Sequence, residues 1–266
     1  MLSFSIITAV KNGASQLQRT IDSVASQTYP HRQHIIIDGA STDGTVDLIH
    51  KNAGKIAFWS SEPDAGISDA FNKGIAKATG DVLQFLNCGD TLVSPDTLVR
   101  VAAEIGKRAD PSREIFYGNA DFIYPAYVLH QEADHALLPD INRIYHQAVF
   151  VGRAVHSALK YDERLWINMD YDMWLRALGK FDFVKLDMTV CNYYTGGISY
   201  SPKIATHKII ENRIVRHLNT RKALSIATLL DLVREIIIYK TIKAIQSFRL
   251  VQILTPLRSK LAKKKS

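Results

Sequence analysis

The first hundred residues alternate between short apolar runs and longer segments in which apolar residues recur every three or four positions. The apolar runs have the length and the β-branched content of buried strands, and they occupy residues 4–10, 34–37, 56–62 and 82–86. Between the first two runs, Leu17, Ile21 and Val24 have helical spacing. Strands that alternate with helices in this way predict an α/β fold with a Rossmann-like, mainly parallel sheet flanked by helices.

The pattern is looser after residue 112. Residues 113–124 (REIFYGNADFIY) favour a strand pair, and residues 146–155 (HQAVFVGRAV) favour a strand followed by a turn. Residues 168–181 (NMDYDMWLRALGKF) have the apolar spacing of a helix. We therefore expect a first domain that ends near residue 203, with a helical, basic extension over residues 204–266.

Charge is distributed unevenly between these two parts. Residues 203–266 carry 15 Lys and Arg against 3 Asp and Glu, whereas residues 1–202 carry 18 against 23. An acidic body with a basic tail argues against nucleic acid as the partner of the body. Apolar residues between 226 and 237 form a helical stripe ahead of the last basic residues, which is typical of a helix on an anionic membrane surface. A helix packed on the body is the alternative.

Composition also indicates the cellular compartment in which the protein is expected. Two cysteines are too few for a disulfide framework, and 47% hydrophobic residues support a sizeable core. The N-terminal apolar run has no basic start and no cleavage site, and no apolar stretch reaches the length of about 20 residues that a spanning helix needs. We expect a cytoplasmic protein that binds peripherally to the inner face of the membrane through its tail.

Polar side chains follow each predicted strand of the first half. Asn12, Asp38, the loop 64–69 and the cluster 87–90 all come directly after an apolar run. Ligands of such sheets bind beyond the carboxyl ends of the strands, so these groups are expected to line one crevice. Loop aspartates commonly cap helices or turns instead. For Asp90, a hard divalent cation such as Mg²⁺ or Mn²⁺, shared with substrate phosphates, is the stronger interpretation.

Four stretches, in this order, resemble family 2 glycosyltransferases, enzymes of the GT-A fold that use a nucleotide-diphosphate sugar. They are SIITAVKNGASQLQRTIDSVASQTY, IIIDGASTDGT, EPDAGISDAFNKGIAKATGD and FLNCGDTL. The resemblance is to bacterial polysaccharide transferases of the colanic-acid type. It implies that residues 1–100 bind the nucleotide sugar and that residues 101–203 bind the acceptor.

The resemblance also implies roles for individual residues. The nucleotide-sugar residues would be Thr8, Val10 and Asn12 around the base, Asp38 on the uracil N–H, and Asp64, Gly66, Asp69, Asn72 and Lys73 beside the ribose and diphosphate. Asp90 corresponds to the metal-binding aspartate. Asn87 and Gly89 stand where the family often has acids, although the Asn87 carbonyl oxygen can still accept from a ribose hydroxyl.

On the acceptor side, Asp170 stands at the position of the family's catalytic base. Inverting transfer needs a carboxylate that takes the proton of the acceptor hydroxyl, although Asp170 could also cap the helix that follows it. His146 and Gln147 match a pair that faces the acceptor or the diphosphate. The chain lacks the QxxRW segment of processive members, which favours the addition of one sugar at a time.

The sequence therefore predicts an inverting glycosyltransferase that moves a single sugar from a nucleotide-diphosphate donor, with UDP favoured, to a saccharide or lipid-linked acceptor in cell-surface polysaccharide biosynthesis. A nucleotide-sugar-binding or scaffold protein of weak activity is the alternative. A dinucleotide-dependent oxidoreductase is disfavoured because no G-x-G-x-x-G follows the first strand.

Overall fold

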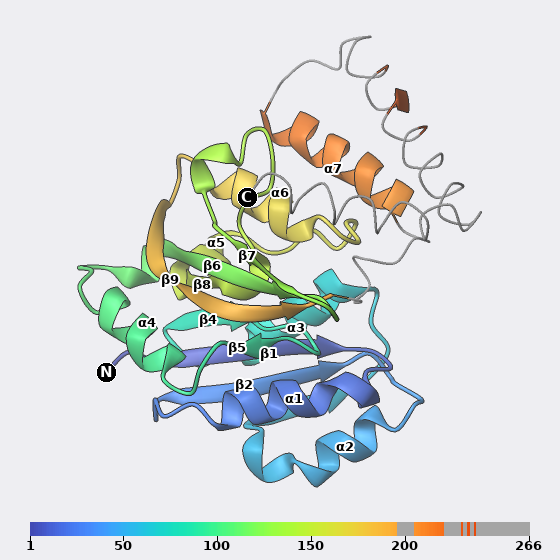
Figure 1. The fold of residues 1–266 in the computed structure, drawn as a ribbon, viewed down its shortest axis with the longest axis vertical. Coiled ribbons are helices and arrows are strands. Elements are labelled where there is room, and N and C mark those ends of the chain that lie inside the picture. Colours follow the sequence, from blue (N-terminus) through green and yellow to red (C-terminus); the bar gives the residue numbers. More distant parts are fainter. Residues whose placement is uncertain (196–204, 221–229, 231–232, 235–236, 238–266) are drawn as a thin grey trace, which may run out of the picture.

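The computed structural model describes residues 1–195, 205–220, 230, 233, 234 and 237. Its β-strands form one sheet in the order β3-β2-β1-β4-β8-β6-β9-β5, with β7 paired to β6 (Figure 1). The strands are β1 (Phe4–Val10), β2 (Arg32–Asp38), β3 (Phe58–Ser61), β4 (Val82–Phe85), β5 (Thr91–Leu92), β6 (Glu114–Ile123), β7 (Val128–Gln131), β8 (Val149–Gly152) and β9 (Asp182–Tyr194). The predicted α/β fold is confirmed.

The helices also follow the predicted order in the first half. They are α1 (Ala14–Ala25), α2 (Thr45–Lys51), α3 (Ile67–Lys77), α4 (Thr97–Ile105), α5 (Arg153–Ala158), α6 (Met169–Ala177) and α7 (Ala205–Thr220). Short 3-10 turns are η1 (Ala53–Lys55), η2 (Pro111–Arg113), η3 (His135–Leu137) and η4 (His146–Ala148). The rest of the predicted helical extension, with half of its apolar stripe and its terminal basic residues, lies outside the described residues.

Strand direction divides the sheet. β3, β2, β1 and β4 are parallel to one another, as predicted, and β6 is parallel to β9. β8 joins the two parts because it runs antiparallel to both β4 and β6, and β5 and β7 are antiparallel edge partners. The carboxyl end of β4 is thereby placed next to the start of β8, which follows η4.

The predicted strand pair over residues 113–124 is wrong, because this segment forms the single strand β6. Gly118 and Asn119 lie at a register shift against β9, within the strand. A Cβ at position 118 would come within 2.8 Å of the Met188 carbonyl oxygen, so glycine allows the close approach of the two backbones. The actual hairpin follows, between β6 and β7.

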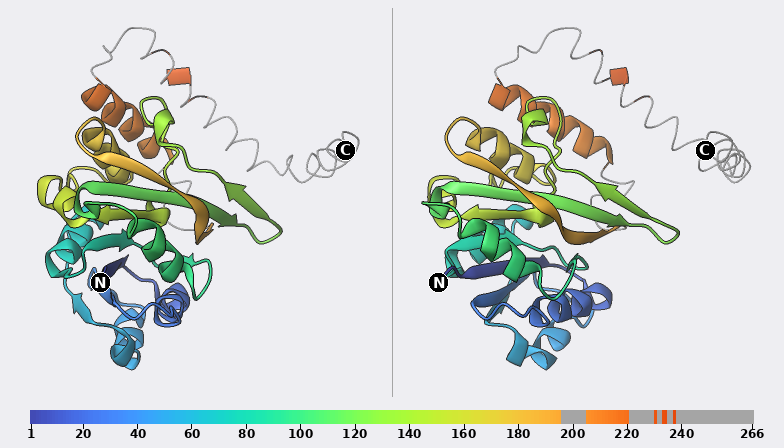
Figure 2. Two further views of the ribbon diagram at one scale, coloured as in Figure 1. Left: turned by 90° about the vertical axis from the view of Figure 1, so that its left-hand side faces the viewer. Right: turned by 60° about the vertical axis from the view of Figure 1, so that its left-hand side comes forward.

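Alternating residues of the strands bury into two layers. Ile7, Ile35 and Phe85 face α3, α5 and α6, through Phe71, Val155 and Trp174 among others. The neighbouring strand positions face α1, α2 and α4. α7 lies beside α6, on the far side of the molecule from α1 and α2 (Figures 1 and 2). Among the described residues, no helix is long and apolar enough to span a membrane.

Candidate active site

A cavity of about 550 Å³ opens beyond the carboxyl ends of β1 and β4. Seven of the predicted site residues line it: Val10, Asn12, Asp64, Gly66, Asn87, Asp90 and Gln147. Other lining residues include Lys11, Gln16, Cys88, Trp166, Tyr193 and Tyr194. The structure thus brings together polar groups from both halves of the chain, as expected for the ligand-binding edge of such a sheet.

The end of β1 is shaped by a tight backbone turn at Asn12. This residue has φ 52°, in the left-handed region that asparagine tolerates better than most residues. Its side-chain oxygen accepts from the Thr42 N–H at 2.9 Å, and its own N–H donates to the Ser41 hydroxyl at 2.7 Å. The loop after β2 is therefore fastened to the cavity wall that Val10 and Asn12 form.

Thr8 and Asp38 do not line the cavity. The Thr8 hydroxyl donates to the Leu86 carbonyl at 2.8 Å inside the core. The buried Asp38 carboxylate accepts from the Ser41 N–H at 2.9 Å and from the hydroxyls of Ser41 and Ser61 at 2.5 and 2.7 Å. In this structure Asp38 organises the loop after β2, and its role toward a nucleotide base stays a prediction.

The loop before α3 places Asp64 and Gly66 in the cavity wall. Gly66 has φ 132°, a conformation suited to glycine, and Asp64 accepts from its N–H at 3.1 Å. Asp69 and Lys73 lie behind this loop. The Asp69 carboxylate accepts from the Ala65 N–H at 3.0 Å, and the Lys73 ammonium lies 3.2 Å from both Asp69 and Glu62. These two predicted site residues brace the loop.

Asn72 is directed toward a different segment. Its amide nitrogen donates to the Tyr161 carbonyl at 3.0 Å and its oxygen accepts from the Tyr161 N–H at 3.1 Å. Both bonds hold the backbone that leads toward α6. Asn72 therefore links α3 to the segment that carries Asp170.

Asp90 is the most deeply buried acid of the cavity wall, with 4% of its surface exposed. Its two carboxylate oxygens accept from the Gln147 side-chain amide at 3.0 Å and from the Tyr194 N–H at 2.9 Å. Burial raises the pKa of Asp90 to about 7, against the lowering effect of these bonds and of the Arg19 charge. A cation beside it would stabilise its charged form.

The donor set near Asp90 fits a divalent cation that takes its remaining ligands from phosphates. The side-chain oxygen of Asn87, also in the cavity wall, is buried without a hydrogen-bond partner. One carboxylate and one amide oxygen are hard ligands of the type that Mg²⁺ and Mn²⁺ accept together with substrate phosphates. Within the described residues, no group of three or more His, Cys, Asp and Glu could hold a metal by itself.

Asp170 lies in the first turn of α6, outside the cavity lining. Its carboxylate accepts from the Tyr171 N–H at 2.8 Å and from the Asn142 amide at 3.4 Å. The side chain keeps part of its surface open to solvent. Loss of hydration nevertheless raises the pKa of Asp170 to about 6, although Lys208 and the hydrogen bonds favour the charged form. A carboxyl with this pKa is suited to act as a base near neutral pH.

His146 and Gln147 are adjacent in η4 but face different partners. Gln147 contacts Asp90, while the His146 ring lies 2.8 Å from the Tyr161 hydroxyl. Burial lowers the pKa of His146 to about 3, so the ring is neutral. Burial also raises the pKa of Tyr161, with a smaller contribution from the Asp170 charge. His146 is therefore packed behind the site, and only Gln147 reaches the cavity.

The sequence did not indicate the aromatic side chains that line one wall of the cavity, or the arginine packed against them. Tyr193 and Tyr194 close the end of β9, and the Arg19 guanidinium lies 4.1 Å from the centre of the Tyr194 ring. Trp166 lines the cavity although 52% of it is exposed. An exposed tryptophan between two predicted motifs is the one local signal that could have indicated this wall.

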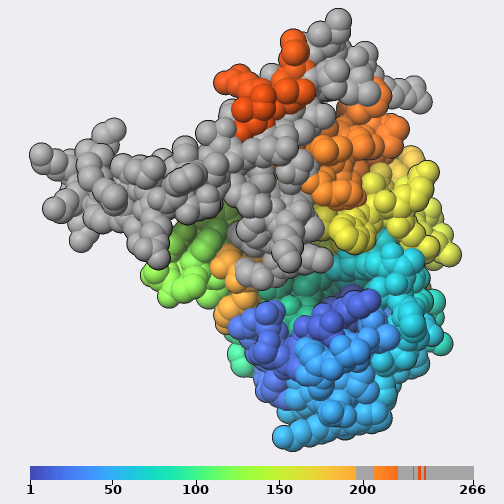
Figure 3. Space-filling view, turned by 90° about the vertical axis from the view of Figure 1, so that its right-hand side faces the viewer, coloured from blue at the N-terminus to red at the C-terminus, as the bar shows by residue number. Residues whose placement is uncertain are grey.

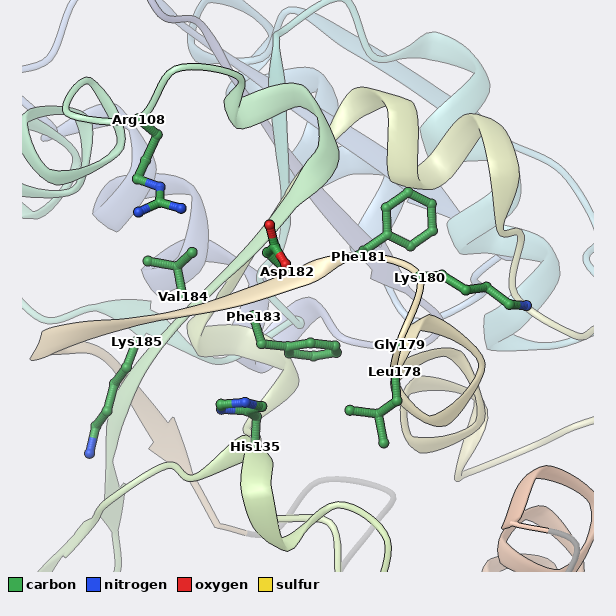
Figure 4. Close-up of a pocket in the computed structure, with 10 residues that line it drawn as sticks. All are labelled: Arg108, His135, Leu178, Gly179, Lys180, Phe181, Asp182, Phe183, Val184 and Lys185. Carbon is green, nitrogen blue, oxygen red and sulfur yellow. The ribbon is translucent and has the colours of Figure 1, made fainter.

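A second depression, of about 710 Å³, lies at the start of β9 and is lined by residues that include Arg108, His135 and Phe183 (Figure 4). It contains none of the predicted site residues. Arg108 is paired with Glu114 at 2.7 Å, and the His135 ring is stacked on Phe183 and bonded to the Tyr117 hydroxyl. Because these groups are engaged with protein partners, the candidate active site is the cavity at Asp90.

Comparison with known proteins gives a consistent result. The family model described as glycosyl transferase family 2 matches residues 5–157. A PGL/p-HBAD biosynthesis glycosyltransferase of Mycobacterium tuberculosis is 31% identical over 238 residues, which cover 87% of this chain and 90% of that protein.

Solved structures share the fold at low identity. S. aureus TarS 1-349 in complex with UDP has a TM-score of 0.62 and 16% identity, and the match covers 80% of this chain and 65% of that one. The mannosyltransferase PcManGT from Pyrobaculum calidifontis in complex with GDP-Man and Mn²⁺ has a TM-score of 0.61 and 15% identity, with 96% and 87% covered.

Proposed function

Since the chain belongs to glycosyl transferase family 2 and is a glycosyltransferase, we propose that it transfers one sugar, with inversion, from a nucleoside-diphosphate sugar to a saccharide or lipid-linked acceptor. The observation that carries the proposal is the cavity of about 550 Å³ in which Asn12, Asp64 and Asp90 meet at the carboxyl ends of the parallel strands. Its size suits a nucleotide sugar. The structural relatives named above were solved with UDP or GDP-Man.

In the proposed reaction, the acceptor hydroxyl oxygen forms a bond to the anomeric carbon while the bond from that carbon to the diphosphate oxygen breaks. The nucleoside diphosphate leaves with the electron pair, and the Asp170 carboxylate takes the hydroxyl proton. Asp170 is the candidate because it stands at the position of the family's base, in the first turn of α6. Its pKa of about 6 is consistent with this role, since it leaves the carboxyl largely charged at neutral pH.

Asn87 and Asp90 would hold a divalent cation, Mn²⁺ or Mg²⁺, which when bound stabilises negative charge on the leaving diphosphate. Gln147 and the Tyr194 N–H orient the Asp90 carboxylate from the protein side. Arg19, packed on the Tyr194 ring, adds a fixed positive charge near the same wall. UDP is the proposed nucleotide because the resemblance assigns Asp38 to the uracil N–H, although in this structure the Asp38 carboxylate is bonded to Ser41 and Ser61 outside the cavity lining.

The basic C-terminal tail supports binding of the acceptor at a membrane surface. Residues 203–266 carry 15 basic and 3 acidic residues, and Ile210, Ile214 and Leu218 form an exposed apolar stripe along α7. These features support peripheral binding to the anionic inner face of the membrane, as part of cell-surface glycan synthesis. Deletion of residues 240–266 should lower binding to anionic vesicles and leave donor binding unchanged, and unaltered vesicle binding would contradict this role.

The first test combines binding and turnover. Thermal shifts are measured with UDP, GDP and dTDP sugars, with and without Mn²⁺, and a ligand at one hundred times its dissociation constant should stabilise by about 2.7 kcal/mol. Release of the nucleoside diphosphate is then followed with saccharide and lipid-linked acceptors. Asp170→Asn should keep the shift and lose turnover, whereas Asp47→Asn, on the exposed face of α2, should keep both.

The outcomes separate the alternatives. Binding of one nucleotide class together with Asp170-dependent release supports the transferase. Binding without release in the wild type, with any acceptor, favours a nucleotide-sugar-binding scaffold. Absence of both would contradict the proposal.

A further inference from the structure

Glu211 is a buried acid on α7 whose hydrogen-bond partners lie in a distant loop, and the His207 ring on the same helix lies 3.6 Å from its carboxylate. It is 5% exposed, and its carboxylate accepts from the backbone N–H groups of Trp166, Ile167 and Asn168 at 2.6, 2.8 and 2.7 Å. The Asn168 side-chain amide adds a fourth bond at 3.1 Å. Three successive N–H groups directed at one carboxylate make a set of charge-assisted hydrogen bonds, which are stronger than neutral ones.

The loop held by Glu211 is fixed from its other side by α3. The Ser68 hydroxyl donates to the Leu165 carbonyl at 2.9 Å, and Asn72 bonds the backbone of Tyr161. In the space-filling view, α7 (orange) lies against the yellow segment that contains this loop and α6, and that segment lies against the cyan α3 region (Figure 3). The loop is therefore clamped between two helices, one from each end of the chain.

This loop carries two parts of the candidate active site. Trp166 lines the cavity, and its ring lies 3.5 Å from the position that a Cβ on Gly66 would occupy. Asn168 is the N-cap of α6, and Asp170 follows in the first turn. One turn before Glu211 on α7, Lys208 contributes a positive charge that lowers the pKa of Asp170.

We propose that Glu211 is a positioning residue of the transferase: it holds residues 165–168 so that Trp166 forms the cavity wall against Gly66 and α6 presents Asp170 toward the acceptor. The proposal rests on the proposed function. It also gives α7, which the sequence indicated only as part of a basic extension, a direct part in the active site.

Docking of α7 by itself does not require an acid at this position. One turn further along the same face, Val215 is fully buried in the core, and Asn219 donates to Asp172 of α6 at 2.9 Å. Burial of an unpaired charge is costly, and an apolar side chain would pack as well or better if packing were its only role. Glu211 accepts from backbone N–H groups that lie outside regular secondary structure and therefore need other hydrogen-bond acceptors.

The test compares Glu211→Gln with Val215→Ala, which truncates a buried side chain on the same face of α7 without removing a loop contact. Amide hydrogen exchange is measured on peptides that cover residues 165–169, together with nucleoside-diphosphate affinity, kcat and the KM of the acceptor. In Glu211→Gln, exchange of residues 166–168 should accelerate and kcat should fall about ten- to a hundredfold, the loss expected for hydrogen bonds to a charged group.

Nucleoside-diphosphate affinity should fall less than kcat in Glu211→Gln, because Glu211 acts on the cavity through Trp166 and contacts none of the strand-end residues that line it. Glu211→Asp, which keeps the charge on a shorter side chain, should recover part of kcat. Val215→Ala should lower the melting temperature and leave loop exchange and kcat of the folded protein unchanged.

Two results would overturn the proposal. One is unchanged loop exchange and kcat in Glu211→Gln, and the other is a loss of kcat that merely follows the unfolded fraction, as in Val215→Ala. If the wild type releases no nucleoside diphosphate from any donor, the proposed function has failed, whereas loop exchange still decides whether Glu211 holds the loop.

Discussion

The side-chain amide of Gln147 donates to the carboxylate of Asp90 over 3.0 Å, and this bond joins the two halves of the sheet. Asp90 follows β4, whereas Gln147 lies in η4 immediately before β8, the strand that pairs antiparallel with β4. The backbone of Gln147 is fixed in turn, because the Gln84 side chain donates to its carbonyl at 2.7 Å. The acid proposed to face the diphosphate is therefore oriented by the half of the chain proposed to bind the acceptor.

Gln147→Ala should consequently reduce transfer more than stability. Removing a hydrogen bond to a charged group costs about 1.5–3 kcal/mol, equivalent to roughly ten- to a hundredfold in kcat/KM if Asp90 acts in the transition state. Steady-state kinetics with a fixed donor measure this. Gln18→Ala is the matched control, since its amide bonds Asp22 and Asn52 away from the cavity. Equal kinetics for both variants would contradict the role of Gln147.

Asn87→Asp should strengthen metal binding. The Asn87 oxygen is buried in the cavity wall without a partner, so a carboxylate there would add a charged ligand next to Asp90. The Mn²⁺ concentration that gives half-maximal activity should fall, and Asp90→Asn should raise it. A titration of initial rate against Mn²⁺ at saturating donor measures both changes. A metal requirement that neither substitution alters would place the cation elsewhere.

The first half of the fold could be predicted because its signals are local. Ile6 and Ile7 bury on opposite faces of the sheet, as the β-strand pattern requires, and the polar ends of β1 and β4 meet in the cavity. β9 was not identified from the sequence. Its residues Val184, Leu186, Met188 and Val190 do alternate with polar residues, as in a half-buried strand. The pattern does not give its partners, because β9 pairs in parallel with β6 across a register shift and antiparallel with β5.

The missed site residues depend on contacts between distant parts of the chain. The Tyr194 N–H reaches Asp90 only because β5 pairs with the end of β9, a pairing across about one hundred residues that no local pattern encodes. Glu211 looks like any surface acid on an amphipathic helix until the loop it holds is known. Lys73 differs from these residues, because the resemblance did assign it a role beside the diphosphate. In this structure its ammonium pairs with Asp69 and Glu62 instead.

Gly39→Ala should weaken nucleotide binding through Asp64. A Cβ at position 39 would overlap the Asp64 carboxylate, so that side chain would have to leave its place in the cavity wall. Overpacking of this kind costs about 1–3 kcal/mol. Thermal shifts with UDP measure the loss of affinity. Gly54→Ala is the control, because a Cβ there meets nothing within 4 Å, and equal UDP affinity in the two variants would show that Asp64 is not needed in its present position.

The pH dependence of transfer should report Asp170. Its pKa of about 6 means that the carboxyl is increasingly protonated below pH 6 and can no longer accept the proton of the acceptor hydroxyl, so kcat/KM should fall on the acid side. Lys208 favours the charged form of Asp170. Replacing it in Lys208→Met removes that charge and should raise the Asp170 pKa, which moves the acid limb of the profile to higher pH.

Lys51→Met, an exposed lysine at the end of α2, is the control for a general change in charge and should leave the profile in place. Tyr161 and the amide of Asn142 also face Asp170, but at these pH values neither of them changes its charge. If the acid limb moves in Lys208→Met and not in Lys51→Met, the titrating group lies beside α7. An acid limb that stays fixed, or that moves to lower pH, would mean that a group other than Asp170 accepts the proton.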